Sequence, residues 1–441
     1  MQNLPPSLRL IAENALSEIK KNNIDHAEVM IGEGRGFSVN ARLGDVETLE
    51  HHDKKSFTVT IIHQQCTGSA SSADFSQNSI VATIEKAIAI ARFSSSDPFS
   101  GLADPARLAF HYPNCELSHP WNITPAEAIT LAIDCEKKAV SFDKRITNSD
   151  GASVSSVHSH SLYANTLGFL GEYESTEHAI SCSVLARDGN HMQRDDAYSV
   201  ARNPDDLWSI EKIAQSAAQK TVNRLNARKV KTQNCPVIFE ASVAKSLLRS
   251  LVHAISGSSL YRQSSFLLNK LNTVVFPSFI DVFQQPHLLS AMGSCPFDSE
   301  GVATVNQHYI KNGELVSYAL GSYSARKLKM QSTGNAGGVF NLSISHMDIT
   351  LAQLLKKMDR GLLVTELMGQ GVNITTGDYS RGASGFWVEK GEIQFPVEEV
   401  TIAGNLKNIF LGIVASANDV DTRTGVRTGS ILVDHMTVAG E

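Results

Sequence analysis

The sequence predicts an α+β fold in two parts: an N-terminal domain of two helix–β-meander–helix halves, and a mainly antiparallel, barrel-like β domain with few helices. Three observations lead to this prediction. Helical and alternating segments follow one another twice in the same order over residues 1–228. Short β-branched segments dominate residues 235–441. The stretch between them, Asn226–Asn234, is polar, as linkers are.

The first half of the N-terminal domain begins with a helix over Leu8–Lys21, where apolar residues recur at helical spacing. Alternating segments follow, and a second helical pattern over Asn78–Phe93 closes the half. The alternating segments are Ala27–Ile31, Phe37–Asn40, Val46–Leu49 and Ser56–His63. The glycines that punctuate them, Gly32, Gly34, Gly36 and Gly44, predict the turns of an antiparallel meander.

The second half repeats this order. Its first helix begins after Thr124, because Thr124, Pro125 and Glu127 form the pattern of an N-cap with a capping box, and it runs to Val140. A closing helix spans Asp205–Leu225, with Asn203 or Asp205 as its cap. The strand-like segments between the helices are Ile146–Ala152, His158–Ala164, Gly171–Glu174 and Ala179–Ala186. The sequence therefore predicts an internal repeat of residues 1–95 and 120–228.

The second domain, residues 235–441, is rich in predicted strands and has helical patterns only at Ala241–Ser256 and Ile349–Lys357. Asn312-Gly313 and Lys390-Gly391 each predict a tight hairpin turn, because glycine takes positive φ readily. The predicted strands are Pro236–Phe239, Thr273–Phe276, Val302–Val305, Glu314–Leu320, Leu363–Leu367, Phe386–Glu389, Glu392–Pro396 and Ser430–Val433.

Composition and charge exclude several classes of partner. The formal net charge is −6 and no window holds five consecutive Lys and Arg residues, so we expect no nucleic-acid partner. No run reaches the ~18 apolar residues of a membrane helix, and the first residues lack the features of a secretory signal. We therefore expect a cytoplasmic protein with no membrane partner. The six cysteines include no C-x-x-C pair and predict reduced thiols.

The helix over Ala241–Ser256 carries the chain's one fragment of a metal-binding pattern. A metallopeptidase helix needs two histidines about one turn apart and a glutamate beside the first to activate water. Here only His253 is present, followed by Ala254, with Gly257 and Ser258 where a second histidine is needed. We therefore expect no catalytic residue and no metal in this chain, and we expect His253 to be a packed, hydrogen-bonded core residue.

Two other stretches carry candidate binding groups. Asp378–Gly382 combines charge, an aromatic ring and glycine, which suits contact with a peptide backbone, and Ser332–Gly338 is a small-residue loop that could cradle an anion. Asp378, Tyr379, Arg381 and Asn335 are accordingly the candidate substrate-binding residues. His158 and His160 share one face of a predicted strand, but no third metal ligand is evident.

Several strings in the second domain resemble the TldD/PmbA family, once called modulators of DNA gyrase. They agree in order and spacing over most of residues 235–441. The strings are Gly337–Leu342, Leu363–Gly382, Gly385–Val397, Thr401–Leu406, Asn418–Arg423 and Met436–Gly440. The first domain resembles the family more loosely, through its repeated layout.

The resemblance implies a metallopeptidase-like second domain and a specific branch of the family. TldD-type members carry H-E-x-x-x-H on the helix corresponding to Ala241–Ser256, and a late cysteine as third zinc ligand. In this chain His253 is the only remnant of that motif, and Asp421–Gly429, which would hold the cysteine, has none. The chain is thus similar to PmbA/TldE-type members.

For such a chain the resemblance implies a non-catalytic subunit that pairs with a zinc-bearing TldD-like partner in the processing of peptides and degradation of unfolded peptides. Such a chain would form a homodimer when alone. Two alternatives stay open: a metallopeptidase active in its own right, with His253 and further ligands not visible in the sequence, and a peptide-binding homodimer that cleaves nothing. Metal content distinguishes an active metallopeptidase from the other two functions. Co-purification with a TldD-like protein distinguishes the non-catalytic subunit from the peptide-binding homodimer.

Overall fold

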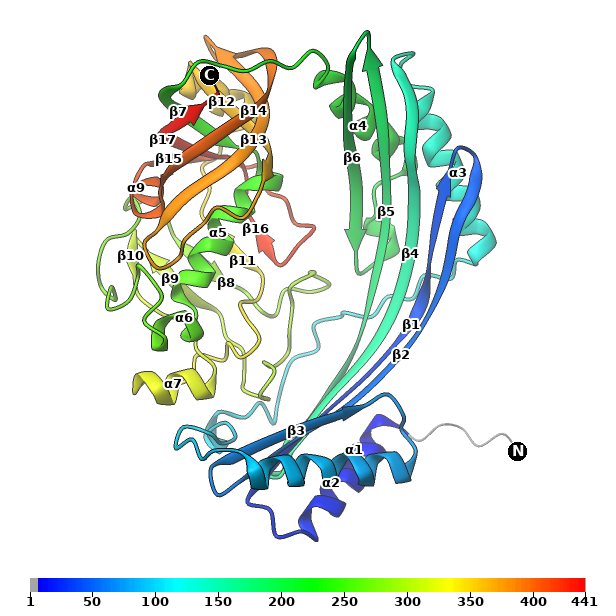
Figure 1. Cartoon of the computed structure of the whole chain (residues 1–441), viewed down its shortest axis with the longest axis vertical. Helices are drawn as coiled ribbons and strands as arrows, with labels where there is room; N and C mark the ends of the chain where they lie inside the picture. The colour runs from blue at the N-terminus through cyan, green and yellow to red at the C-terminus, as the bar shows by residue number, and fades with distance from the viewer. Residues whose placement is uncertain (1–6, 441) are drawn as a thin grey trace.

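The computed structural model describes residues 7–440; residues 1–6 and 441, at the outer ends of the two predicted domains, lie outside the described residues. The N-terminal part is built on one antiparallel six-stranded sheet with strand order β3-β2-β1-β4-β5-β6 (Figure 1). The strands are β1 (His26–Arg42), β2 (Asp45–His63), β3 (Cys66–Ser72), β4 (Ile146–Asn165), β5 (Leu170–Asp188) and β6 (His191–Ala201). Each predicted half contributes three consecutive strands, and the halves join where β1 pairs with β4.

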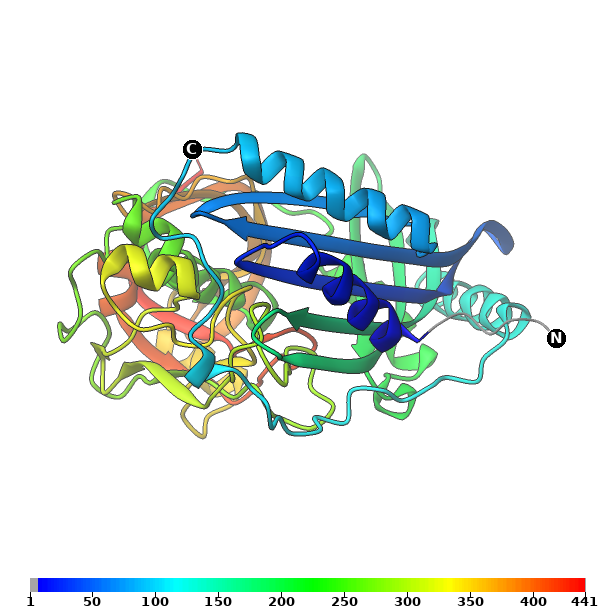
Figure 2. The same cartoon turned by 90° about the horizontal axis from the view of Figure 1, so that it is seen from below.

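Four helices cover one face of this sheet in two groups. The helices are α1 (Leu8–Lys20), α2 (Gln77–Phe93), α3 (Pro125–Val140) and α4 (Ile210–Asn223). Val29 and Ile31 of β1 pack with α1 and α2, while Val39 of the same strand packs in the core with α3 and α4. Side chains two apart on a strand share a face, so both helix pairs lie on the same side. Figure 2 shows α1 and α2 lying along one end of the sheet.

The strands of this sheet are far longer than predicted, and this corrects the expected turns. Gly32, Gly34 and Gly36 are not turns but lie within β1, whose pairing with β2 and β4 runs through them. Of the four glycines, only Gly44 lies in a turn, between β1 and β2, with φ +82°. At Gly36 a Cβ would lie 2.1 Å from the carbonyl oxygen of Ser156 on β4, so glycine is there to let two backbones approach.

The helix ends confirm one predicted cap and correct another. Thr124 and Glu127 form the predicted capping box of α3, in which each side chain accepts from the other residue's backbone N–H. The closing helix α4 begins only at Ile210, with Ser209 as its N-cap. Asn203 instead caps a separate 3-10 turn, η2 (Pro204–Asp206). The prediction merged these two elements because only residues 207–209 separate them and their N-caps, Asn203 and Ser209, lie six residues apart.

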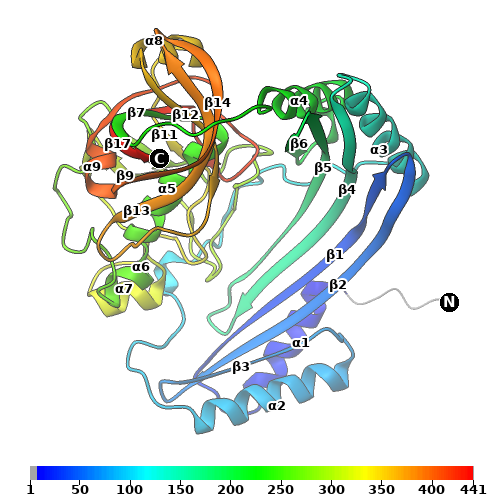
Figure 3. The same ribbon diagram turned by 45° about the horizontal axis from the view of Figure 1, so that its top comes forward.

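The C-terminal part contains a closed five-stranded barrel of order β14-β13-β12-β7-β17, in which β14 pairs with β17, and β15 extends it (Figure 3). The strands are β7 (Gln233–Phe239), β12 (Gly361–Met368), β13 (Asp378–Glu389), β14 (Glu392–Asn405), β15 (Ile413–Ser416) and β17 (Ile431–Ala439). Phe239 packs with helix α5 (Ala241–Ile255), while its neighbour Ile238 packs with helix α8 (Leu351–Met358). The α+β class and the barrel-like second part are thus confirmed.

A second, mixed sheet of order β10-β9-β8-β11-β16 lies beside the barrel. Its strands are β8 (Val282–Gln284), β9 (Gln307–Lys311), β10 (Glu314–Leu315), β11 (Leu342–Ile344) and β16 (Val426–Arg427). The remaining short helices are η1 (Pro105–Arg107), α6 (Gly257–Tyr261), α7 (Ser322–Leu328) and α9 (Leu406–Leu411). Both predicted hairpin turns are confirmed, with positive φ at each of their residues.

Three predicted strands of the second part are wrong in whole or in part. Thr273–Phe276 and Val302–Val305 form only isolated bridges, such as Val274 with Glu314 and Val302 with Leu108. Strand β10 ends at Leu315, where the prediction extended to Leu320. Only some of the apolar residues in these segments are buried, such as Phe276, Val302 and Leu320, while Val274 and Val305 are exposed. A short apolar run therefore does not by itself identify a strand.

Three arginines connect the two parts of the molecule. Arg224, at the end of α4, donates to Asp195 of β6 and to Glu366 of β12. Arg423 donates to the carbonyl oxygen of Tyr198 on β6, and Arg326 of α7 donates to three carbonyl oxygens of residues 99–102. Within residues 7–440, no helix combines the length and the apolar character needed to cross a membrane.

Candidate functional site

Helix α5 buries one face and carries basic residues on the other. Ala244, Leu247, Leu251 and Ala254 are buried in the core shared with the barrel. On the other face, Lys245, Arg249 and His253 follow one another at four-residue spacing, which places them in one stripe. Arg249 and His253 are exposed, and the side chain of neither forms a hydrogen bond or ion pair within the described residues.

The exposure of His253 corrects the expectation that it packs in the core. Its backbone carbonyl oxygen accepts from the N–H and hydroxyl of Ser256, at 3.4 and 2.9 Å, but its imidazole lies outside the buried stripe of α5. The helix stops at Ile255, and Ser258 already belongs to α6. The apolar neighbours of His253 in the sequence, Val252 and Ala254, led to the prediction of burial. The helical spacing, however, places the His253 side chain on the exposed face of α5.

The residues around His253 do not fit a zinc ion. Zinc takes imidazole, thiolate or carboxylate ligands, and a catalytic site needs three of them. The motif positions after His253 offer Ala254 and the hydroxyl of Ser258, and Ser258 lies 3.3 Å from the hydroxyl of Ser256. Among residues 7–440, no group of three His, Cys, Asp or Glu side chains is placed to hold a metal.

The segment Asp421–Gly429 lies against α5 and is occupied by an ion pair. Arg423 donates through Nε and Nη2 to the two carboxylate oxygens of Asp421, each at 2.9 Å. The Lys245 ammonium lies 3.8 Å from the same carboxylate. Burial opposes ionisation, but the hydrogen bonds from Arg423 hold the pKa of Asp421 below its usual value. The Arg423 guanidinium also lies 4.3 Å from the ring centre of Tyr198, which anchors this segment to the sheet.

A cleft of about 330 Å³ opens where α5 meets α6. It is lined on one side by Val252, Ser256 and Ser258, and on the other by the loop Asn335–Gly338. A second cleft of about 500 Å³ shares Ala336 and Gly337 with the first and runs to the face of the sheet without helices. Its sheet residues include Met30, Gly32, Ser56, Thr58 and Tyr163. We call these two adjoining clefts the α5 groove.

A buried carboxylate shapes the wall of the α5 groove. Asp298 is 1% exposed and accepts from the backbone N–H groups of Glu300, Val302 and Ala336. Burial raises its pKa to about 7, against the opposing effect of these donors. The contact with Ala336 fixes the loop that both clefts share.

Asn335 belongs to this loop, and hydrogen bonds from its side chain hold the loop in place. Its side chain accepts from Gln307 at 2.7 Å and donates to Gln284 at 3.0 Å and to the Gly338 carbonyl at 2.8 Å. The side chain is therefore engaged within the protein, and Asn335 contributes to the groove as part of its loop. The network was not visible in the sequence, because its members are far apart along the chain.

The structure brings together Tyr379 and Arg381 but not the other two candidate substrate-binding residues. The Tyr379 hydroxyl is buried beside Ser246 of α5 and Arg381, and burial raises its pKa to about 12. Asp378 is exposed and accepts from Thr376 and Asn405, which lowers its pKa. Ser246 and the basic stripe of α5 were missed from the sequence, although the four-residue spacing of Lys245, Arg249 and His253 could have revealed the stripe.

His158 and His160 form cross-strand pairs. His158 lies 3.1 Å from Glu174, and His160 lies 3.1 Å from Glu172. Glu172 in turn accepts from Arg9 of α1 at 2.7 Å. These contacts explain both histidines as parts of the sheet surface.

The comparisons with known proteins agree with this architecture. Three family models match in succession: "PmbA/TldA metallopeptidase domain 1" over residues 27–91, the "central domain" over 118–225, and the "C-terminal domain" over 232–440. The matches divide the chain into three successive domains of the type that these family models describe. The chain belongs to the PmbA/TldD metallopeptidase family.

Individual relatives place the chain within this family. The "Metalloprotease PmbA" of Escherichia coli O157:H7 is 45% identical over 98% of this chain and 97% of its own length. The "Metalloprotease TldD homolog" of Haemophilus influenzae is 25% identical over 69% of this chain and 68% of its own length. A crystal structure from Bacteroides thetaiotaomicron, titled as a candidate modulator of DNA gyrase, has a TM-score of 0.94 at 26% identity and covers 99% of this chain and 100% of its own.

Proposed function

We propose that this chain is the non-catalytic, PmbA/TldE-type subunit of a cytoplasmic heterodimeric metalloprotease that processes peptides and degrades unfolded ones. A TldD-like partner supplies the zinc. One observation carries the proposal: at the helix position where the family resemblance places the zinc ligands, the chain offers a single exposed imidazole beside Ala254 and Ser258. The similarity to proteins named PmbA supports the same branch.

The α5 groove is the surface that receives the peptide in this proposal. It begins at the end of α5, where the metal motif is degenerate, and continues to the free face of the long sheet. Arg249 and His253 are exposed on the same helix and have no side-chain partner among residues 7–440, so both are accessible to a bound chain. The α5 groove can bind a substrate peptide without cleaving it, while the partner subunit catalyses the hydrolysis.

The test is reconstitution with a TldD-type subunit. The two purified chains, mixed, are expected to elute as one complex and to hydrolyse an unfolded peptide that this chain alone leaves intact. Ser258→Trp places a large ring in the α5 groove and is expected to lower hydrolysis about fivefold or more without breaking the complex. Ser95→Trp, at an exposed position after α2, serves as the matched control. Hydrolysis by this chain alone, or equal activity of both variants, would contradict the proposal.

In the absence of that partner, the proposal expects a homodimer. A two-subunit chamber needs a large interface, and stable assemblies of this kind bury more than about 2,000 Å² in total. Light scattering at micromolar concentration is expected to give the mass of two chains. A monomer under these conditions would contradict this part of the proposal.

A further inference from the structure

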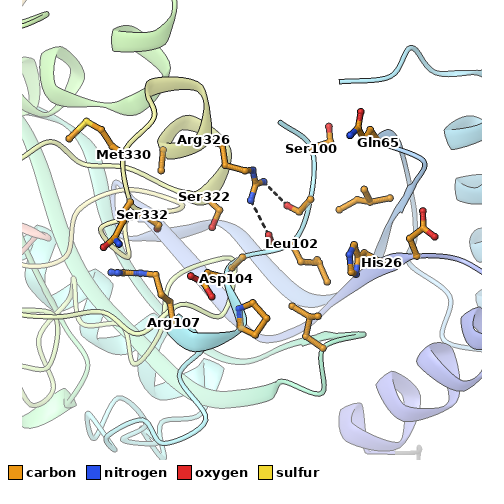
Figure 4. Close-up of a pocket in the computed structure, with 18 of the residues that line it drawn as sticks. His26, Gln65, Ser100, Leu102, Asp104, Arg107, Ser322, Arg326, Met330 and Ser332 are labelled. Carbon is orange, nitrogen blue, oxygen red and sulfur yellow. Dashed lines mark hydrogen bonds between the residues drawn. The ribbon is translucent and has the colours of Figure 1, made fainter. Parts of the chain in front are cut away.

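A larger cavity, of about 670 Å³, lies between the two parts of the molecule and apart from the α5 groove (Figure 4). The ends of β1 and β2 line it with His26, Ile62 and Gln64. The loop 100–107 and the stretch from α7 to Ser332 line the rest. Helix α7 contributes to both places, since Ser322 and Arg326 face this cavity while Tyr323 and Ser324 line the α5 groove.

Two polar side chains in this cavity lack partners. The half-buried guanidinium of Arg107 forms no hydrogen bond, ion pair or ring contact with any residue of the described chain, and its Nε is fully buried. The hydroxyl of Ser322, a residue only 5% exposed, is likewise unpaired. Leaving such groups unpaired is costly, so a site that holds both is built for a ligand that accepts hydrogen bonds.

A second guanidinium adds positive charge to the same wall. Arg326 donates to the carbonyl oxygens of Phe99, Gly101 and Leu102 at 2.6, 2.7 and 3.0 Å. These acceptors are neutral, so they satisfy its donors without cancelling its charge. In Figure 4, Ser322 lies between Arg326 and Arg107. The ligand that suits this wall is an anion.

The other residues that line the cavity indicate which kind of anion it would bind. Asp25 and Asp104, both exposed, also line the cavity, and their charge disfavours a dianion such as phosphate. Much of the remaining surface is apolar. It consists of Ile62, Leu102, Ala103, Pro105, Leu167, Ala325 and Met330. A monoanion attached to an apolar group fits both features.

We propose that this cavity binds the C-terminal residue of a peptide, with its carboxylate on Arg107 and Ser322 and its apolar side chain against the apolar wall. This inference rests on the proposed function, because it takes the occupant of the α5 groove to be a peptide. Helix α7 borders both places, so one peptide can lie in the groove and end in the cavity. Arg326 positions the loop 99–102 and does not itself need to touch the ligand.

The test compares matched ligands that differ only at the C-terminus. Peptides ending in leucine, with a free carboxylate or a terminal amide and an uncharged coumarin label, are titrated with the full chain and followed by anisotropy. The free acid is expected to bind about tenfold or more tightly, the effect of a charge-assisted hydrogen bond. N-acetyl-leucine, N-acetyl-leucinamide and inorganic phosphate, observed by ligand NMR, show whether a free small carboxylate occupies the same site.

Variants of the cavity residues test whether the cavity causes the preference for a free C-terminal carboxylate. Arg107→Gln is expected to abolish the difference between acid and amide, and Arg107→Lys to retain part of it, because the charge remains. Arg92→Gln, at an exposed and unpaired arginine of α2, is the control and is expected to change nothing. The side chain of Arg107 holds no other residue of the described chain, so Arg107→Gln is expected to melt at the temperature of the parent chain.

The outcomes separate this inference from the proposed function. Equal binding of acid and amide peptides overturns the inference and leaves peptide binding in place. Absence of binding by every ligand overturns the inference and removes support for the α5 groove as a peptide site. Binding of N-acetyl-leucine without the peptides supports the carboxylate site and overturns its assignment to a peptide terminus.

Discussion

At the scale of single residues, the basic side chains differ in whether the protein itself provides them with partners. Arg107, Arg249 and His253 have no partner among residues 7–440, whereas Arg224, Arg326 and Arg423 are each held by two or more acceptors. The paired arginines connect the two parts of the molecule. The side chain of Arg107 lines the cavity, and those of Arg249 and His253 are exposed on α5.

The exposure of His253 gives the first prediction. His253→Ala is expected to change the free energy of unfolding by less than about 0.5 kcal/mol, because an exposed side chain without partners contributes little. Leu251→Ala, two residues earlier and fully buried, is the comparison and is expected to cost about 2–5 kcal/mol. Urea denaturation of both variants measures this. A large loss for His253→Ala would show that the imidazole is engaged in the folded protein.

The sequence could show which zinc ligands are missing, because a motif is read position by position. It could not show that Asn335 is locked into a network with Gln284 and Gln307. That network depends on contacts between segments far apart in the chain. The unpaired state of Arg107 is of the same kind, since nothing beside it in sequence indicates the absence of a partner.

At the scale of elements, the longer helices were predicted within about five residues at each end, the short helices α6, α7 and α9 were not predicted, and the long strands of the N-terminal sheet were predicted only in fragments. Helix limits are set by caps that lie in the local sequence, as Thr124 and Glu127 show for α3. The length of β1 is set instead by β2 and β4, which pair with it along both edges. Glycines that predict turns when the sequence is considered alone can therefore lie within a strand, when that strand is paired with a neighbouring strand on each side.

The glycines of β1 give the second prediction. In Gly36→Ala the new Cβ would lie 2.1 Å from the Ser156 carbonyl oxygen, so β4 has to move, at a cost of about 1–3 kcal/mol or more. In Gly34→Ala the nearest atom is 3.7 Å away, an ordinary contact, and stability is expected to stay the same or rise by about 0.5–1 kcal/mol. Thermal unfolding of the Gly36→Ala and Gly34→Ala variants measures the two effects on stability. Equal effects would mean that β1 and β4 do not pair as described.

The third prediction concerns His178 of β5 and the effect of pH. Its ring nitrogens contact the Ser156 hydroxyl and the His119 carbonyl, both at 2.9 Å, and burial lowers its pKa below the usual 6.5. The hydrogen bond to His119 and the charge of Glu177 oppose this shift. Because the unfolded chain binds the proton more readily, this contribution to stability is complete above about pH 6.5 and is lost as pH falls below it.

The measurement is the free energy of unfolding between pH 7.5 and 5. The parent chain is expected to lose stability toward the acid end, and His178→Gln is expected to make the curve shallower. His191→Gln, at an exposed position of β6, should leave the curve as it is. A curve that His178→Gln does not alter would contradict a buried, neutral His178.

At the scale of the whole molecule, two successive halves form one sheet, and a separate β-rich part folds against it (Figure 1). We propose a division near residues 226–235, with residues 1–228 and 235–441 as the two domains. Limited proteolysis is then expected to cut within 226–235 before it cuts Pro236–Val252, because the first stretch is largely exposed and irregular and the second is mostly buried. First cleavage inside Pro236–Val252 would contradict this division.

The central claim is that this chain alone holds no catalytic zinc, and elemental analysis of the purified, tag-free chain tests it most directly. The account predicts much less than one zinc per chain, unchanged by His253→Ala, and no peptide hydrolysis. It also predicts that Ala254→Glu combined with Ser258→His stays inactive, because Asp421–Gly429 provides no thiolate. One zinc per chain that disappears in His253→Ala, together with peptidase activity lost in the same variant, would contradict it.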